Sequence, residues 1–169
     1  MKLIEALKKL KSLEKKADDI KDLLRHYCCD MDYETPAYPY QKEKVTGWIQ
    51  AYHDILQEIS RLSYQIQKTN LETKVSIELD GKTIEKSITE WILRRRKLCG
   101  MELALFKSLT DKNLREGPIQ FSGGNTQMAK IRRYYDPQLK ERKLSMLGSE
   151  PFEIDSKLEI VNATTELVE

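Results

Sequence analysis

Glycine, proline and long apolar runs are all scarce in this sequence of 169 residues. Seven glycines and five prolines are too few for a β-sandwich, a β-barrel or a disordered chain, so the composition favours long helices. No run approaches the roughly 18 consecutive apolar residues that a membrane-spanning helix needs. Residues 1–16 mix leucines with lysines and contain no small-residue cleavage site, which excludes a secretory signal there. We therefore expect a cytoplasmic protein.

Cysteine is also rare, with Cys28, Cys29 and Cys99 as the three examples. An odd number that includes an adjacent pair does not form a disulfide framework and fits a reducing compartment. His26 lies near the pair, so a metal site is conceivable, but adjacent helical residues point about 100° apart and cannot share one ligand direction. We expect ordinary, partly buried thiols, no metal site and no cofactor.

Neither sign of charge is in excess, because 29 basic and 27 acidic residues leave a net charge of +2. That balance argues against a general nucleic-acid binder. The charges are unevenly placed, since residues 130–143 are basic and residues 150–169 are acidic. These segments either form two solvated faces or pair with each other, within one chain or between subunits.

Heptad periodicity is what the sequence has in abundance. Apolar residues recur at alternating steps of three and four from Leu3 to Tyr27 and again from Val45 to Thr69, as in the seams of paired helices. We predict helices over residues 3–29 and 41–70, joined by a proline-containing loop. Two helices of similar length joined by a short loop form an antiparallel hairpin, here residues 1–70.

Short β-hairpins and further helices are predicted after this pair. An Asp-Gly pair that follows an alternating strand predicts a β-hairpin over residues 71–86. A capping box, serine followed three residues later by glutamate, opens a helix predicted over residues 87–116. A looser hairpin is predicted over residues 118–136, with its return strand at Ile131–Tyr135.

A C-terminal helix over residues 137–168 completes the predicted elements, and we expect it to be interrupted near Gly148–Pro151. The expected fold is mainly α with small β additions. It consists of an antiparallel long-helix hairpin, a third and a fourth helix, and one or two β-hairpins. We expect these elements to form a single helical domain over residues 1–169.

The predicted helices have more apolar surface than one hairpin can bury. Ile49 and Leu56 form a second stripe beside the seam, and the helix at residues 87–116 is apolar over a wide arc. Self-association would cover this surface, and a compact monomeric bundle is the alternative. The interface candidates are Trp48, Ile49, Tyr52, Leu56, Ile92, Leu103 and Phe106.

Tyrosine and proline are concentrated in the loop between the first two helices, where Tyr33, Tyr38 and Tyr40 accompany Pro36 and Pro39. Exposed tyrosines at the tip of a helical hairpin could contact a partner or a lipid interface. The alternative is a rigid turn whose tyrosines fold back onto the helix ends.

Basic residues gather in the third helix and in the second β-hairpin. One interpretation is phosphate or nucleic-acid binding. The other is ion pairing with the acidic C-terminal segment, within the chain or across subunits. The candidates for anion binding are Arg94, Arg95, Arg96, Lys130, Arg132 and Arg133.

Catalytic motifs are missing. The Gly-Lys-Thr sequence at 81–83 resembles the end of a phosphate-binding loop, but Ser76 stands where that motif requires glycine. The glycine at 81 instead belongs to the turn of the predicted hairpin. The two histidines, His26 and His53, both fall on predicted helices and give acid–base catalysis few groups to use. We predict no catalytic residue and no small-molecule substrate, so an enzyme is the less favoured class.

Four short sequences recur in this order in a known family. They are Met1-Lys2-Leu3, Lys68-Thr69-Asn70, Ile92-Leu93-Arg94-Arg95 and Asn162-Ala163-Thr164-Thr165-Glu166-Leu167. Together they resemble the septicolysin family, small bacterial coiled-coil proteins of unknown function. The resemblance implies a helical hairpin with small β additions that assembles with copies of itself. The family's name implies a membrane-active cytolysin.

Three hypotheses for function follow. The first is a non-catalytic, homo-oligomeric coiled-coil protein that binds a partner or acts as a scaffold. The second is the membrane-active cytolysin that the resemblance implies, which would need an apolar surface released by rearrangement. The third is nucleic-acid binding through the basic residues of the third helix and second hairpin.

Overall fold

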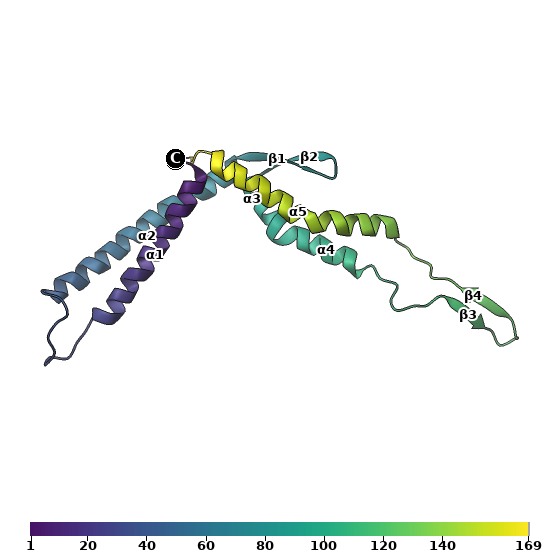
Figure 1. Ribbon diagram of the computed structural model, residues 1–169, viewed down its shortest axis with the longest axis horizontal. Coiled ribbons are helices and arrows are strands. Elements are labelled where there is room, and N and C mark those ends of the chain that lie inside the picture. Colours follow the sequence, from purple (N-terminus) through teal and green to yellow (C-terminus); the bar gives the residue numbers. More distant parts are fainter. Residues whose placement is uncertain (169) are drawn as a thin grey trace. The chain divides into compact units, whose positions relative to one another are not determined.

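The computed structural model describes residues 1–168 and shows a mainly α fold with two small two-stranded sheets, as the sequence predicted (Figure 1). Where one helical domain was predicted, the chain forms two compact units. The terminal unit comprises Met1–Val75, Ser87–Thr89 and the residues from Leu158 onward, and the central unit comprises Ser76–Lys86 and Glu90–Lys157.

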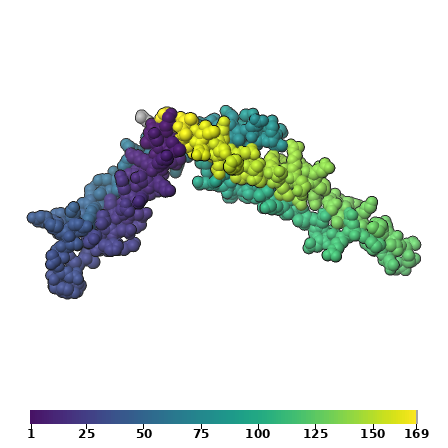
Figure 2. Space-filling model, in the orientation of Figure 1, coloured from purple at the N-terminus to yellow at the C-terminus, as the bar shows by residue number. Residues whose placement is uncertain are grey.

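Two long helices, α1 (Leu3–Tyr27) and α2 (Gln41–Glu72), dominate the terminal unit and pack side by side along their length (Figures 1 and 2). Every predicted seam position on both helices is buried or half-buried, which confirms the helical hairpin. Leu13, Leu62 and Ile66 are among the buried side chains. Each such side chain contributes about 1.5–3 kcal/mol when it leaves water, so the seam itself holds the hairpin together.

The two ends of the described chain bond to each other within the terminal unit. The Met1 amine lies 3.0 Å from the Glu166 carboxylate, and the Leu3 N–H donates to the Thr165 carbonyl at 2.9 Å. The Leu167 N–H donates back to the Met1 carbonyl at 2.8 Å. These bonds fasten the start of α1 to the segment that follows the last helix.

Strands β1 (Lys74–Leu79) and β2 (Lys82–Ser87) form the first predicted hairpin. Asp80 and Gly81 have φ values of 53° and 71°, the left-handed pair that a tight two-residue hairpin turn requires. Ile77 and Leu79 are buried on one face of β1, as the alternating sequence predicted. The Arg142 guanidinium donates to the Asp80 carboxylate at 2.7 Å and tethers the turn to the last helix, α5 (Pro137–Thr164).

A helical segment begins directly after Ser87, as predicted, but ends eight residues earlier than predicted. It consists of α3 (Ile88–Leu93), a π-helical turn η1 (Arg94–Leu98) and α4 (Cys99–Ser108). The prediction of helix up to Glu116 is wrong. Lys112 and Asn113 have φ values of 53° and 61°, so this stretch adopts left-handed backbone that an α-helix cannot contain.

Helix α5 (Pro137–Thr164) is continuous, so the predicted interruption near Gly148–Pro151 is wrong. Proline at 151 has no N–H, which deprives the Leu147 carbonyl of its helical partner. The Cys99 thiol of the facing helix donates to that carbonyl at 3.3 Å. Because the lost hydrogen bond is replaced from outside the helix, α5 passes through its proline.

The second hairpin pairs β3 (Gly117–Gln120) with β4 (Thr126–Ala129), so the predicted return strand at Ile131–Tyr135 is wrong. Ile119 faces Gln127 across the ladder, and Gly124, with φ of 80°, turns the chain between the strands. Every residue from 118 to 128 is exposed. The hairpin extends beyond the ends of α4 and α5 within the central unit (Figure 1).

Candidate interaction surfaces

An uncharged stripe runs along one exposed face of α2 from Ile49 to Leu71, and on the same line Thr46 and the charged Lys42 precede it. Its residues follow one another at steps of four, three, four, four, three and four, and they lie within an arc of about 80° around the helix. All are exposed, and none is charged, although 33% of the chain is charged. We call this set the α2 stripe: Ile49, His53, Leu56, Ser60, Tyr64, Gln67 and Leu71.

Large apolar side chains are spread over the full length of the α2 stripe. Ile49 is 44% exposed, Leu56 41%, Tyr64 66% and Leu71 60%. At 1.5 Å per residue, the stripe spans about 33 Å. The sequence pointed to Ile49 and Leu56 but not to Tyr64 and Leu71. The step from Leu56 to Tyr64 is eight residues, and a search for heptads stops there.

The other predicted interface residues are half-buried. Trp48 and Tyr52 are half-buried in the α1–α2 seam, and Trp48 packs against Tyr27 with ring centroids 6.1 Å apart. In the central unit three further candidates are also half-buried: Ile92, Leu103 and Phe106. Of the seven candidates, Ile49 and Leu56 are therefore the exposed ones, at 44% and 41%.

The tyrosine loop divides between the two predicted outcomes. Tyr38 folds back, as one alternative predicted. Its ring packs edge-on against the rings of Tyr27 and Trp48, with centroids 5.1 and 5.5 Å apart. Burial raises the pKa of the Tyr38 phenol above its ordinary value. Tyr33 and Tyr40 remain exposed, at 78% and 82%, so these two can reach a partner and Tyr38 cannot.

Arg94 lies in a charge network between η1 and α5 in the central unit. Its guanidinium donates to both oxygens of the Glu150 carboxylate, at 2.5 and 2.8 Å, and also lies 2.7 Å from Glu102. Glu150 is only 2% exposed. The hydrogen bond to Glu150 raises the pKa of Arg94 further above its usual range, so the guanidinium stays charged. Burial raises the pKa of the neighbouring Cys99 thiol.

Three of the six predicted anion-binding residues form ion pairs with carboxylates. Arg94 pairs with Glu150 and Arg95 with Asp155 at 2.7 Å, so ion pairing to the acidic C-terminal segment occurs within one chain. Arg133 pairs instead with Asp111, outside that segment. The remaining three candidates are exposed, and none forms an ion pair with any residue from 1 to 168: Arg96, Lys130 and Arg132.

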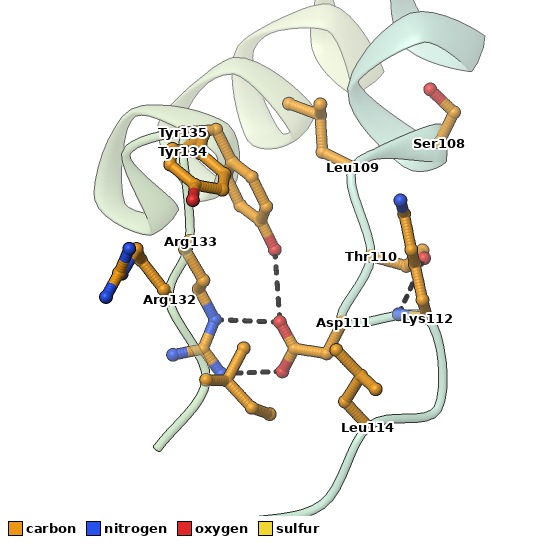
Figure 3. A pocket seen from close by; sticks show the side chains of 11 residues that line it. Ser108, Leu109, Thr110, Asp111, Lys112, Leu114, Arg132, Arg133, Tyr134 and Tyr135 are labelled. Carbon is orange, nitrogen blue, oxygen red and sulfur yellow. Dashed lines mark hydrogen bonds and ion pairs between the residues drawn. The ribbon is translucent and has the colours of Figure 1, made fainter. Parts of the chain in front are cut away.

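A cavity of about 320 Å³ opens in the central unit between the chain that leaves α4 and the chain that enters α5 (Figure 3). The Asp111 carboxylate lines this cavity. It accepts two hydrogen bonds from Arg133, at 2.7 and 2.6 Å, and one from the Tyr135 hydroxyl at 3.4 Å. The bond from Arg133 lowers the pKa of Asp111. The lining residues are Ser108, Leu109, Thr110, Asp111, Lys112, Leu114, Ile131, Arg132, Arg133, Tyr134 and Tyr135.

This cavity contains an ion pair that joins its two loops. Its central carboxylate is already neutralised by Arg133, and its lining contains neither histidine nor cysteine. Figure 3 shows Arg133 and Asp111 joined across the space, with Tyr135 above them. The ion pair therefore fixes the 108–114 loop to the entry of α5.

Metal binding and membrane spanning each require a particular grouping of side chains. Cys28 and Cys29 are exposed, with Sγ atoms 4.0 Å apart, and Cys99 is buried. Within residues 1–168, no group of three or more histidine, cysteine, aspartate or glutamate side chains is placed to hold a metal ion. In the same part of the chain, no helix combines the length and apolar character needed to cross a membrane.

Comparison with known proteins identifies a fold and no function. No family model and no curated protein matches the chain. A crystal structure of a functionally unknown conserved protein from Corynebacterium diphtheriae matches over 99% of both chains, with a TM-score of 0.59 and 17% sequence identity. At that identity the match shows a similar fold alone. No septicolysin is among these findings, so that resemblance remains an expectation from the sequence.

Proposed function

We propose that this protein is a non-catalytic scaffold that assembles with copies of itself through the α2 stripe. The observation that carries the proposal is the stripe: seven exposed, uncharged positions aligned along about 33 Å of one helix. Charged side chains normally occupy the solvent face of such a helix, and their absence along one line is typical of a contact surface.

The distribution of apolar residues also favours a helix as the partner. Four large apolar side chains, spaced seven or eight residues apart, present one contact per two helical turns. This is the spacing at which side chains of two packed helices meet repeatedly along their length. A second α2 has the required length and the same uncharged face.

The test is the solution mass of the wild-type protein and of a variant with a charged stripe. Light scattering behind size exclusion should give the wild type a discrete multiple of 19.8 kDa. Ile49→Glu combined with Leu56→Glu should give a monomer with unchanged helical content by circular dichroism. Both positions are exposed in the single chain, so the substitutions leave the fold intact.

The expected loss of affinity follows from the area still to be buried. Full burial of isoleucine or leucine contributes about 1.5–3 kcal/mol, and about two-fifths of each side chain is still exposed, so each contributes on the order of 1 kcal/mol. Two residues in two copies then give about 4 kcal/mol, or roughly a thousandfold in the dissociation constant. Burying unpaired carboxylates adds to this loss.

A matched control places the same charges on exposed apolar residues of the central unit. Leu139→Glu combined with Phe152→Glu alters α5, where both side chains are exposed. This variant should keep the wild-type mass. A wild-type monomer at the highest attainable concentration, or an unchanged mass for the stripe variant, would show that the stripe does not assemble the protein.

A further inference from the structure

The α2 stripe has the same chemical pattern when it is read from either end. Apolar and polar residues alternate along it, with an apolar residue at each end and Ser60 at the centre. The steps are also symmetric, being four, three and four on each side of Ser60. Residues at equal distances from Ser60 form three pairs of like character: Leu56 with Tyr64, His53 with Gln67, and Ile49 with Leu71.

This symmetry has a geometric meaning when two α2 helices pack antiparallel about a two-fold axis that passes beside Ser60. In such a pair, each residue before Ser60 in one copy faces the residue that lies equally far after Ser60 in the other copy. Leu56 of one copy, for example, faces Tyr64 of the other. Apolar side chains then meet apolar side chains throughout, and the imidazole of His53 meets the amide of Gln67. Among the stripe residues, no charge is brought against an apolar group or against a like charge.

We infer that two copies of this chain pair through their α2 stripes, antiparallel, with the two-fold axis at Ser60. The inference rests on the proposed function and adds to it the orientation and register of the contact. A partner with a different sequence needs no symmetric pattern on this helix. A second copy in antiparallel orientation does need one, because each residue must then match its counterpart on the other side of the axis.

The identity of the central residue supports this register. Packed helices approach to within about 8–10 Å of each other, and the size of the side chains at the closest point sets that distance. Serine is the smallest side chain of the stripe, and it stands where the two helices would be closest. The two Ser60 hydroxyls would meet at the axis, where each can donate and accept a hydrogen bond.

The spacing of the stripe also keeps the contact in line along the whole pair. Each half covers eleven residues, from Ile49 to Ser60 and from Ser60 to Leu71. Eleven residues make slightly more than three whole turns of an α-helix, so the stripe drifts by only about 20° in each half. Two straight helices can therefore stay in contact over the full length without strong supercoiling.

Disulfide cross-linking tests this register directly. In a background with Cys28→Ser and Cys29→Ser, which removes the exposed thiols, Ser60→Cys should form a disulfide-linked dimer under mild oxidation. Gln67→Cys is the matched control, because it is also exposed on the stripe. Its two copies would lie about 21 Å apart along the paired helices, so it should cross-link at least roughly tenfold more slowly than Ser60→Cys.

A mixture of two single-cysteine proteins gives a second, positive test of the orientation. His53→Cys and Gln67→Cys, each carrying a different affinity tag, should cross-link to each other when mixed but not to themselves. Equal self-linking of Gln67→Cys and Ser60→Cys would mean that the helices run parallel, and it would overturn the inference.

Failure of the register and failure of the proposed function give different results. A wild-type protein of dimeric mass in which Ser60→Cys does not cross-link would overturn the register at Ser60. Self-assembly itself would then be judged by the mass of the Ile49→Glu, Leu56→Glu variant. A monomeric wild-type protein would overturn both.

Discussion

Replacing Arg94 with methionine tests the buried charge network of the central unit. Glu150 is 2% exposed and receives two hydrogen bonds from Arg94, at 2.5 and 2.8 Å. Removal of one partner from a buried ion pair typically costs about 3–5 kcal/mol, because the other charge stays buried and unpaired. Methionine is long and flexible enough to fill much of the vacated space, so the loss reports on charge more than on volume.

The expected effect is large for a protein of this size. A loss of 1 kcal/mol lowers the melting temperature of a chain of this length by about 2–4 °C, so Arg94→Met should lower it by roughly 6–20 °C. Trp91 is buried in the central unit, and Trp48 belongs to the terminal unit. Urea unfolding followed by tryptophan fluorescence in a Trp48→Phe background therefore reports on the unit that contains the network.

Two further variants separate charge from packing. Arg94→Lys keeps the charge but loses the two-pronged contact, so its stability should be intermediate. Arg94→Met combined with Glu150→Leu removes both charges and should recover most of the lost stability, since an apolar pair often replaces a buried ion pair without loss. A cost below about 1 kcal/mol for Arg94→Met alone would refute the reasoning, because it would mean that Glu150 finds water or another partner.

Two other predictions concern the bonds that shape α5 and its entry. Cys99→Ala should lower the stability by about 1–3 kcal/mol, because it leaves the Leu147 carbonyl buried without a donor. The loss should be smaller in a Pro151→Ala background, where alanine restores the helical N–H. Thermal unfolding of the wild type, the two single variants and the double variant measures this coupling, and an equal loss in both backgrounds would contradict the role of the thiol. Arg133 lowers the folded-state pKa of Asp111, so Asp111 contributes stability that is fully present above its unfolded pKa of about 3.9 and is lost as pH falls through the lower folded value. Carboxyl NMR should place its titration below that of Asp111 in the Arg133→Gln variant, and identical midpoints would argue against the ion pair.

Local patterns were sufficient to predict most of the helices and the first hairpin. The alternation of three- and four-residue steps located α1 and α2 because both helices bury one narrow face against each other. Asp80 and Gly81 located the first turn because few other residues adopt two successive positive φ values. In these cases the residues that determine the structure are close together in the sequence.

The errors arose where a residue depends on a distant partner. Pro151 indicated a helix break, and the thiol that compensates for it is Cys99, 52 positions earlier in the chain. The end of α4 was placed too late because the pairing of Asp111 with Arg133, which fixes the loop after Ser108, links residues 22 apart. Neither partner could be identified from local periodicity.

The candidate surfaces were predictable only in part for a similar reason. Ile49 and Leu56 were identified because they are one heptad apart, whereas Tyr64 and Leu71 belong to an eleven-residue spacing that only the exposed face of α2 makes visible. The basic residues were identified by type, but whether each is free or paired depends on the fold. The fold places Arg94 and Arg133 beside carboxylates, whereas Arg132 forms no ion pair with any residue from 1 to 168.

The bonds between Met1, Leu3 and the residues near Glu166 have a consequence for the order of events during synthesis. The terminal unit needs the residues from Leu158 onward, which leave the ribosome after the whole of the central unit. At roughly 5–20 residues per second, α1 and α2 wait for several seconds before the segment that completes their unit is made. In that interval the central unit can fold alone, while the start of α1 stays open to solvent and to chaperones.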